Sequence, residues 1–407
     1  MSHIKSVLII ATLDTKNREV EFLESCFRAI DMPFITLDGG IKGSSPLPVA
    51  INREDVAIKG GMSIDEVRNI GHEGEAISVM ARGAREIAMD LYRKGDIGGI
   101  IGLGGSMGTT LVTYVMQAFP VGFPKVMITT MASRDTRPFV GTKDIAMLYS
   151  ICDISGINRI TERVLRNGAL AIAGMVKDSI EFPEPTKPPI IMSTLGTTEI
   201  CAQYIKNTLE KKGREVIVFH TNGSGGEAME EMIKNETVEA VIDLSLHELT
   251  DHYFGGDYDA GPERGLAALK KGIPTIIIPG NIDFIATGPL DKAKRYFPGR
   301  EYHVHNTAIT TIKTKKRELE VIAEIMARFC NEATGNFSVM IPAGGFSVWG
   351  QKGHPFYDPD GVRLFIKVIK KELNPEISLE ILPYNINDSE FAEAIIDKLA
   401  NNLRLEL

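Results

Sequence analysis

The chain has 407 residues, of which 43% are hydrophobic and 24% charged, and its formal net charge is −8. That length exceeds the usual size of one domain, so we expect a globular protein of two domains. Lys and Arg form no long run, which argues against nucleic-acid binding. No apolar stretch approaches the roughly 18 residues of a membrane span. Because the four cysteines form no CxxC pair and no signal peptide is present, we expect a cytoplasmic protein with reduced thiols and neither disulfides nor a zinc site.

The first 180 residues alternate short apolar runs with amphipathic stretches. Strand–helix–strand alternation is typical of a parallel sheet covered by helices on both faces. We therefore predict that residues 1–180 form an α/β domain with a doubly wound, Rossmann-like parallel sheet. Strands are predicted at 5–11, 33–37, 97–103 and 125–130, and helices at 17–30, 63–94 (with candidate breaks at Gly71, Gly74 and Gly83) and 107–118.

A proline-rich segment, EFPEPTKPP at 181–189, follows this domain and is predicted to be a linker, because it can continue neither a helix nor a central strand. The opening pattern then recurs: TLDT at 12–15 matches TLGT at 194–197, and the same offset of 182 residues places the strand at 34–37 on VIVF at 216–219. We predict that residues 190–407 form a second doubly wound α/β domain, related to the first by an ancient duplication. Its further predicted elements are strands at 240–244, 274–278, 338–341 and 380–382, and a helix at 265–271.

Ligands of open parallel sheets bind beyond the carboxyl ends of the strands. In the first domain, the segments TLDTK (12–16), LDGG (37–40), GLGGSMGTT (102–110) and TTMAS (129–133) are expected at that edge. The third has the order strand, glycines, helix. Glycines let a ligand approach the backbone, and free N–H groups at a helix start suit a phosphate.

This glycine-rich segment matches neither the Walker loop nor the GxGxxG spacing, so a plain turn with Ser106 as the helix N-cap is the alternative. We favour phosphate binding. The Asp14 carboxylate is a candidate to bind a ribose or a metal-bound water; alternatively, it caps the following helix. Asp38 is a candidate for ribose hydroxyls or part of a turn, and Asp144 is a further candidate near Mg²⁺. The predicted nucleotide-binding residues are Thr12, Asp14, Thr15, Lys16, Asp38, Gly104, Gly105, Ser106, Gly108, Thr109, Thr129, Thr130 and Ser133.

The second domain has its own candidates. His220 ends a strand and enters TNGSGGEAME, whose glycines repeat the phosphate-loop pattern before a helix. We predict His220, Glu248 and Asp251 as catalytic residues of a polar cleft, with His220 and Glu248 as acid and base; a capped helix with surface carboxylates is the alternative. HELTDH (247–252) is not a zinc-hydrolase motif, because its histidines are five apart and lie about 140° apart on a helix. The single Trp349 lies in a loop expected to cover a sheet edge.

GGSMG (104–108) has the Gly-x-Ser-x-Gly outline of a nucleophile elbow. A serine hydrolase would also need an acid and a histidine at later strand ends. The two additional glycines and the two threonines of this segment favour ligand binding over a nucleophilic serine.

Several long motifs occur in a fixed order along the chain: ATLDTK, LGGSMGTT, PVGFPKVMITTMAS, FVGTKDIAMLYS, FHTNGSGGEAME, ELTDHYFGGDYDAGPER and NIND. With them, the chain resembles the Tm-one-like ATP-binding family over essentially its whole length. That family comprises the N-terminal domain of a plant tobamovirus-resistance inhibitor and microbial relatives of unassigned activity. The resemblance implies two α/β subdomains, an ATP-binding surface and a homodimer, but no particular reaction. Met107 stands where many relatives have Gly, which narrows the approach to the loop.

Three functions follow as alternatives. The first is a cytosolic ATP- or nucleotide-binding protein, phosphoryl-transferring or ATP-regulated, with Mg²⁺ beside the phosphates. The second is a metabolic enzyme acting on a small phosphorylated or carboxylated substrate in the cleft of the second domain. The third is a non-enzymatic interaction module. The sequence identifies neither a substrate nor a reaction.

Overall fold

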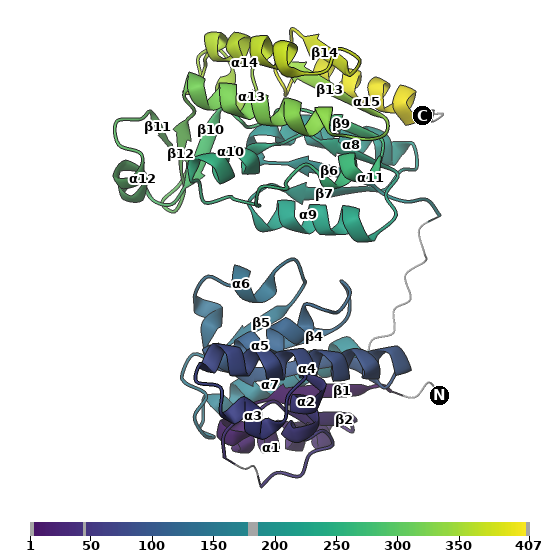
Figure 1. Ribbon diagram of the computed structural model, residues 1–407, viewed down its shortest axis with the longest axis vertical. Coiled ribbons are helices and arrows are strands. Elements are labelled where there is room, and N and C mark those ends of the chain that lie inside the picture. Colours follow the sequence, from purple (N-terminus) through teal and green to yellow (C-terminus); the bar gives the residue numbers. More distant parts are fainter. Residues whose placement is uncertain (1–3, 44–45, 178–185, 404–407) are drawn as a thin grey trace. The chain divides into compact units, whose positions relative to one another are not determined.

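The computed structural model describes residues 4–43, 46–177 and 186–403 of the chain. They form two compact units, Met1–Pro183 and Glu184–Leu407, each built from parallel strands and helices (Figure 1). Residues 178–185, which include most of the predicted linker, lie outside the described residues, and residues 186–189 form neither helix nor strand.

The first unit has a five-stranded sheet in the order β2-β1-β3-β4-β5, and every pair of neighbouring strands is parallel. The strands are β1(Ser6–Ala11), β2(Phe34–Asp38), β3(Ile97–Gly104), β4(Lys125–Thr129) and β5(Ala146–Tyr149). The helices are α1(Leu13–Ala29), α2(Arg53–Lys59), α3(Ile64–Arg68), α4(Glu73–Lys94), α5(Ser106–Met116), α6(Arg137–Val140) and α7(Thr161–Lys177), with a short 3₁₀ helix η1(Thr130–Ser133).

Alternate residues of β1 pack into two different cores, as the period of two in a strand requires. Leu8 and Ile10 pack with apolar residues of α2, α4 and α5, whereas Val7 and Ile9 pack with those of α1 and α7. Every one of these β1 side chains is fully buried. The sheet is therefore covered on both faces, which explains why its central strands are continuous apolar runs.

The second unit has a six-stranded parallel sheet in the order β14-β13-β9-β8-β6-β7, and a three-stranded antiparallel sheet in the order β10-β12-β11. The strands are β6(Ile190–Thr194), β7(Val216–His220), β8(Ala240–Asp243), β9(Thr275–Ile277), β10(Phe284–Thr287), β11(Tyr302–Val304), β12(Thr310–Lys313), β13(Phe337–Pro342) and β14(Ser378–Leu382). The helices are α8(Glu199–Lys211), α9(Ser224–Asn235), α10(His247–Phe254), α11(Ala267–Lys271), α12(Leu290–Tyr296), α13(Lys316–Asn331), α14(Pro359–Glu372) and α15(Ser389–Leu403), with 3₁₀ helices η2(Gly196–Thr198) and η3(Val348–Gly350).

The two units begin with the same topology. In the first, β2 lies on one side of β1 and β3 on the other; in the second, β7 lies on one side of β6 and β8 on the other. The predicted offset of 182 residues places β2 directly on β7. The prediction of two doubly wound parallel sheets is confirmed, whereas the antiparallel sheet of the second unit was not predicted.

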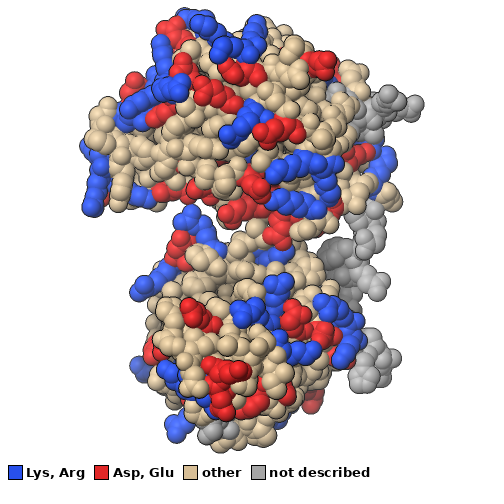
Figure 2. All heavy atoms as spheres, viewed as in Figure 1, with Lys and Arg blue, Asp and Glu red and all other residues tan. Residues whose placement is uncertain are grey.

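On the face shown in Figure 2, Lys and Arg side chains alternate with Asp and Glu side chains over both units. In the described part of the chain, no helix is both long and apolar enough to cross a membrane.

The stretch predicted as helical at 63–94 is broken only once. It is interrupted between Arg68 and Glu73, near Gly71, and α4 then runs unbroken through Gly74 and Gly83. A Cβ built on Gly83 would lie 1.8 Å from the carbonyl oxygen of Val56 in α2. Gly83 therefore allows two helices to pack closely and does not end one.

We predict opposite effects for alanine at two helical glycines of the first unit. Gly83→Ala should lower the free energy of unfolding by about 1–3 kcal/mol or more, because α2 and α4 must separate. Gly174→Ala, in α7, adds its Cβ to open space and should raise that free energy by about 0.5–1 kcal/mol. Urea denaturation followed by circular dichroism measures both, and equal effects would contradict the close contact.

Candidate functional site

The four predicted ligand segments of the first unit meet at one edge of its sheet. Ala11 pairs with Asp38, Ile10 with Gly102, and Gly104 with Thr129. These strands are parallel, so the segments that follow them all leave the carboxyl edge. The strand order reverses between β1 and β3, and such a switch point is where open α/β sheets bind ligands.

The glycine-rich segment between β3 and α5 leaves its backbone accessible. Gly105, not Ser106, is the N-cap of α5, and no side chain caps this helix among the described residues. A Cβ built on Gly105 would meet only the Thr130 Oγ1, at 3.9 Å, whereas one on Gly104 would lie 3.0 Å from the Cα of Gly108. Gly104 thus serves the packing of strand against helix, and Gly105 leaves the first turn of α5 open to a ligand.

Two buried threonines support this turn. The hydroxyl of Thr109 donates to the carbonyl of Gly105 at 2.7 Å, and its oxygen lies 2.6 Å from the Thr129 hydroxyl. The Thr129 oxygen also accepts from the N–H of Met131 at 2.9 Å. These bonds fix the position of the loop relative to η1, which carries Thr130 and Ser133.

Asp38 and Asp14 bind the loop that follows β2. One carboxylate oxygen of Asp38 accepts from the N–H groups of Leu13 and Gly40, at 3.1 and 2.8 Å, and the other contacts the Arg53 guanidinium at 2.7 Å. Asp14 uses only one oxygen, which accepts from the N–H groups of the loop residues 41 and 42. Asp38 therefore has no oxygen left for a ribose, whereas Asp14 has one.

The remaining candidates of this edge differ in their exposure. Lys16 is half-buried at a non-helical kink of α1, and its amino group contacts no partner within the described residues. Thr15 and Ser133 are exposed. The hydroxyls of Thr12 and Thr15 lie 3.3 Å apart.

Asp144 lies at the wrong edge for a phosphate ligand, and its prediction as a residue near Mg²⁺ is corrected. It pairs at 2.7 Å with the buried Lys125, the first residue of β4, which lies at the amino edge of the sheet. The Lys125 ammonium and the N–H of Gly122 hold the pKa of the Asp144 carboxyl below its usual value although burial opposes this.

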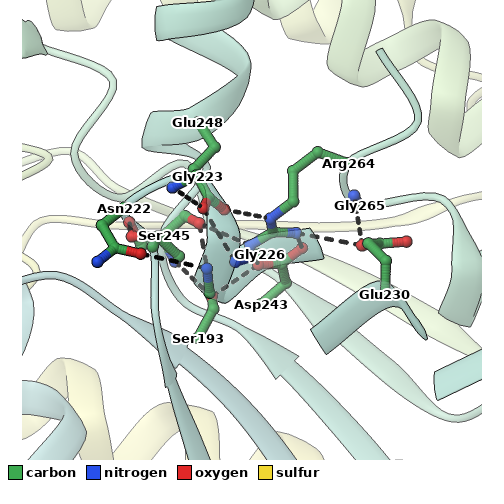
Figure 3. A network of polar contacts seen from close by, with 12 residues as sticks. Ser193, Asn222, Gly223, Gly226, Glu230, Asp243, Ser245, Glu248, Arg264 and Gly265 are labelled. Atoms are coloured by element: carbon green, nitrogen blue, oxygen red, sulfur yellow. Dashed lines mark hydrogen bonds and ion pairs between the residues drawn. The ribbon is translucent and has the colours of Figure 1, made fainter. Parts of the chain in front are cut away.

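In the second unit, the glycine-rich segment before α9 already holds an anion from the same chain. One Glu248 oxygen accepts from the N–H groups of Gly223 and Gly226 at 2.6 and 3.0 Å (Figure 3). A Cβ on Gly226 would lie 1.9 Å from the other Glu248 oxygen, so glycine is required there. The phosphate-loop pattern of TNGSGG is thus filled by a carboxylate at the start of α9.

The fully buried Arg264 joins Glu248 to two further carboxylates (Figure 3). Its guanidinium donates to both oxygens of Asp243 at 2.7 Å and to Glu248 at 2.7 Å, and it lies 3.4 Å from Glu230. We call these four residues the Arg264 cluster. It ties β8, α9 and α10 to the segment before α11.

One guanidinium cannot neutralise three carboxylates. Burial raises the pKa of Glu248 and of Glu230, and the nearby Arg264 only partly offsets this. The carboxylates in turn raise the pKa of Arg264 well above its usual value, against the effect of burial. Burial thus favours the protonated forms of Glu248 and Glu230 more than exposure to water would.

Asp251, the third predicted catalytic residue, is also fully buried. Its oxygens accept from the N–H groups of Ala286 and Tyr258 at 3.0 and 2.9 Å, and one lies 3.4 Å from the Nε2 of His247. A Cβ on Gly256 would lie 2.0 Å from its carboxyl carbon. Asp251 and Glu248 thus bind backbone groups, whereas His220 is exposed at the end of β7 and its imidazole has no hydrogen-bond partner among the described residues.

His220 lines a pocket of about 360 Å³ beyond the carboxyl ends of β6 and β7. The pocket lies between the turn after β6, the antiparallel sheet and η3. Its lining consists of Leu195, Gly196, Thr197, His220, Tyr258, Phe284, Ala286, His305, Ile309, Thr311, Val348 and Trp349.

Sequence reasoning missed two residues that organise this region. Arg264 stood in a motif without a role assigned to it. Asn281 has a left-handed backbone (φ 61°), and its side chain bonds the hydroxyls of Thr197, Thr198 and Ser245. A Pro-Gly-Asn segment (279–281) directly after a predicted strand is the signal that would have pointed to Asn281.

The comparisons with known proteins identify both units. Residues 5–181 match the family model of the N-terminal domain, and residues 187–403 that of the C-terminal domain, of an uncharacterised protein family, UPF0261. A UPF0261 protein of Clostridium tetani is 37% identical over 398 residues, which are 98% of each chain. The ToMV resistance protein Tm-1(GCR237) of Solanum lycopersicum is 30% identical over 97% of this chain. The chain spans 55% of the length of that plant protein.

Two solved structures of UDP-N-acetylglucosamine 2-epimerases are weakly similar. The enzyme of Methanocaldococcus jannaschii is 10% identical, with 67% of this chain and 83% of that chain covered, at a TM-score of 0.22. The enzyme of Rickettsia bellii is 8% identical, with 99% of this chain and 98% of that chain covered, at a TM-score of 0.24. Such scores carry no argument about activity. The resemblance to the tobamovirus-resistance inhibitor is confirmed as sequence similarity, and ATP binding stays a prediction.

Removing the positive charge of the Arg264 cluster should destabilise the protein strongly. Arg264→Met leaves three carboxylates in a dry site and should lower the free energy of unfolding at pH 7 by about 3–5 kcal/mol. Glu248→Gln keeps an amide oxygen that can accept from the two glycine N–H groups, so it should lower the free energy of unfolding by less than Arg264→Met does. Urea denaturation of both variants measures this. Without the guanidinium, the buried carboxyl groups are tolerated best in their protonated form. The loss of unfolding free energy in Arg264→Met, relative to the wild type, should therefore shrink toward pH 5. A loss that does not change with pH would contradict this.

Asp283 should make stability fall as the pH rises. Burial raises the pKa of this buried carboxyl to about 6, although the Ser347 hydroxyl opposes the shift. The folded protein therefore holds this proton more tightly than the unfolded chain, an advantage present below about pH 4 and lost as the pH passes 6. The free energy of unfolding, relative to that of Asp283→Asn, should fall by about 2.5 kcal/mol between pH 4 and pH 7.5. Denaturation curves that show a constant difference would refute the expectation.

Proposed function

The chain belongs to the UPF0261 family, and from this premise we propose that it is a nucleotide-binding protein that holds the phosphates of ATP at the carboxyl edge of the first unit. The observation that carries the proposal is the uncapped first turn of α5, whose N-cap residue Gly105 has open space where a side chain would stand. N–H groups at a helix start and the helix dipole favour an anion there.

The groups around this turn have the chemistry that a phosphate chain needs. The Thr130 hydroxyl is the atom nearest to the open face of Gly105. Lys16 and Arg134 leave the same edge of the sheet, and neither side chain has a partner within the described residues. Two cations without carboxylate partners can pair with phosphate oxygens.

A Mg²⁺ ion that accompanies ATP needs hard oxygen ligands. Asp14 fits this requirement, because one of its oxygens accepts no hydrogen bond within the described residues, whereas both oxygens of Asp38 are bound. In this proposal, Asp14 faces the ion, while Asp38 and Arg53 hold the loop after β2. The metal would supply neutralisation of phosphate charge when bound.

The second candidate function is an enzyme that uses the pocket of the second unit. It is favoured by that pocket and by the exposed His220, which is free to act as an acid or a base. Glu248 is less suited to that role, because its oxygens bind Gly223, Gly226 and Arg264.

The test is a calorimetric titration with ATP and Mg²⁺ of the wild type, Gly105→Val and Gly174→Val. Gly105 has extended backbone angles (φ −79°, ψ −156°) that valine also adopts, so the variant should fold. Its side chain blocks the approach to the helix start, and we expect at least about a ten-fold loss of affinity. Gly174→Val, on the exposed side of α7, serves as the matched control and should bind as the wild type does.

Two results would overturn this assignment. If Gly105→Val binds ATP as tightly as the wild type does, and circular dichroism shows that both are folded, the phosphates do not bind at this loop. An absence of binding to the wild type would refute ATP as the ligand.

A further inference from the structure

The pocket of the second unit has one wall of aromatic rings. Trp349 contacts Phe284 edge to face with ring centroids 4.8 Å apart, and His305 lies 6.1 Å from the same indole. Tyr258 is part of the same lining. Rings arranged in this way pack best against another flat ring, offset or edge to face. The volume of about 360 Å³ lies within the range of small-molecule sites.

The pocket also offers hydrogen-bond donors. Gly196 is exposed, and a Cβ built on it would find no atom within 4 Å, so a ligand can reach the backbone of the turn that leads into α8. The His220 imidazole and the Tyr258 hydroxyl have no hydrogen-bond partner in the described part of the chain. Burial and the nearby Asp251 raise the pKa of Tyr258, which keeps its hydroxyl a donor.

The charges of the lining restrict the ligand further. No Asp or Glu is among the lining residues, so the pocket surface itself carries no carboxylate, and the nearby Asp251 is bound to the N–H groups of Tyr258 and Ala286. No Lys or Arg is among the lining residues either, so a polyphosphate would find no cation to pair with. Backbone N–H groups, an imidazole and a phenol suit a single negative charge.

We propose that this pocket is a second ligand site, separate from the nucleotide site of the first unit, for a small planar aromatic molecule that carries one carboxylate. The ring lies against Trp349 and Phe284, and the carboxylate faces Gly196 and His220. The site does not depend on the proposed ATP binding, since all its residues belong to the second unit.

The single tryptophan of the chain makes the proposal directly testable. The fluorescence of Trp349 is recorded while the full-length protein is titrated with benzoate, with benzamide, which lacks the charge, and with cyclohexanecarboxylate, which lacks the flat ring. We expect a saturable change with benzoate and an affinity at least ten-fold lower for the other two probes.

Two variants locate the site. Gly196→Val fills the open space above the turn and should weaken benzoate binding at least ten-fold. Ile200 is an exposed residue of α8 outside the lining, so Ile200→Ala should bind benzoate as the wild type does. Circular dichroism shows whether each variant is folded. If Gly196→Val does not fold, His220→Gln replaces it, with the same expected loss of affinity for benzoate.

The proposal is overturned if benzoate produces no saturable change, if all three probes bind alike, or if the folded Gly196→Val binds as the wild type does. Competition between ATP and benzoate would also overturn it, because the nucleotide would then occupy this pocket. ATP calorimetry on Gly196→Val separates the two proposals: loss of ATP binding there contradicts the site in the first unit, and unchanged ATP binding leaves it intact.

Discussion

The second unit is organised around a guanidinium that has been removed from water. Arg264 is fully buried, and a buried cation is tolerated only where acceptors surround it. Asp243, Glu230 and Glu248 provide them, and each comes from a different element. The end of β8, the helices α9 and α10, and the segment before α11 must therefore come together for this one side chain. Gly226 is required for the same reason, because the Glu248 carboxylate lies against its Cα.

The two units share a local sequence pattern but differ in whether a side chain binds the helix start that follows it. In each, glycines follow a strand and precede a helix. In the second unit, the N–H groups at the start of α9 bind Glu248 of the same chain. In the first, no described side chain caps α5. A helix start whose donors are satisfied from within supports the fold, and one whose donors are free is available to an external anion. This difference is why the proposed nucleotide site lies in the first unit.

The sequence predicted the parallel sheets well because buried strands are continuous apolar runs and β2 and β7 follow the same repeat. It also placed the ligand segments of the first unit at one edge, since parallel topology leaves no other arrangement. The roles of the acids were not predictable, because they depend on partners distant in sequence: Asp38 faces Arg53, and Glu248 faces Gly223. The antiparallel sheet, whose strands β10, β11 and β12 have three or four residues each, was not predicted. The pocket residues come from six separate segments, so no local motif marks them.

The order of the strands in the second sheet also bears on when each unit becomes complete during synthesis. Every strand of the first sheet precedes residue 150, and the last helix of that unit ends at Lys177. In the second sheet, β13 lies between β9 and β14, and α15 packs on α8, where the Tyr204 hydroxyl donates to Glu393 at 2.8 Å. The ribosome therefore releases the first unit with all its internal contacts available, whereas the second unit lacks one of its covering helices until residues 389–403 have been synthesised.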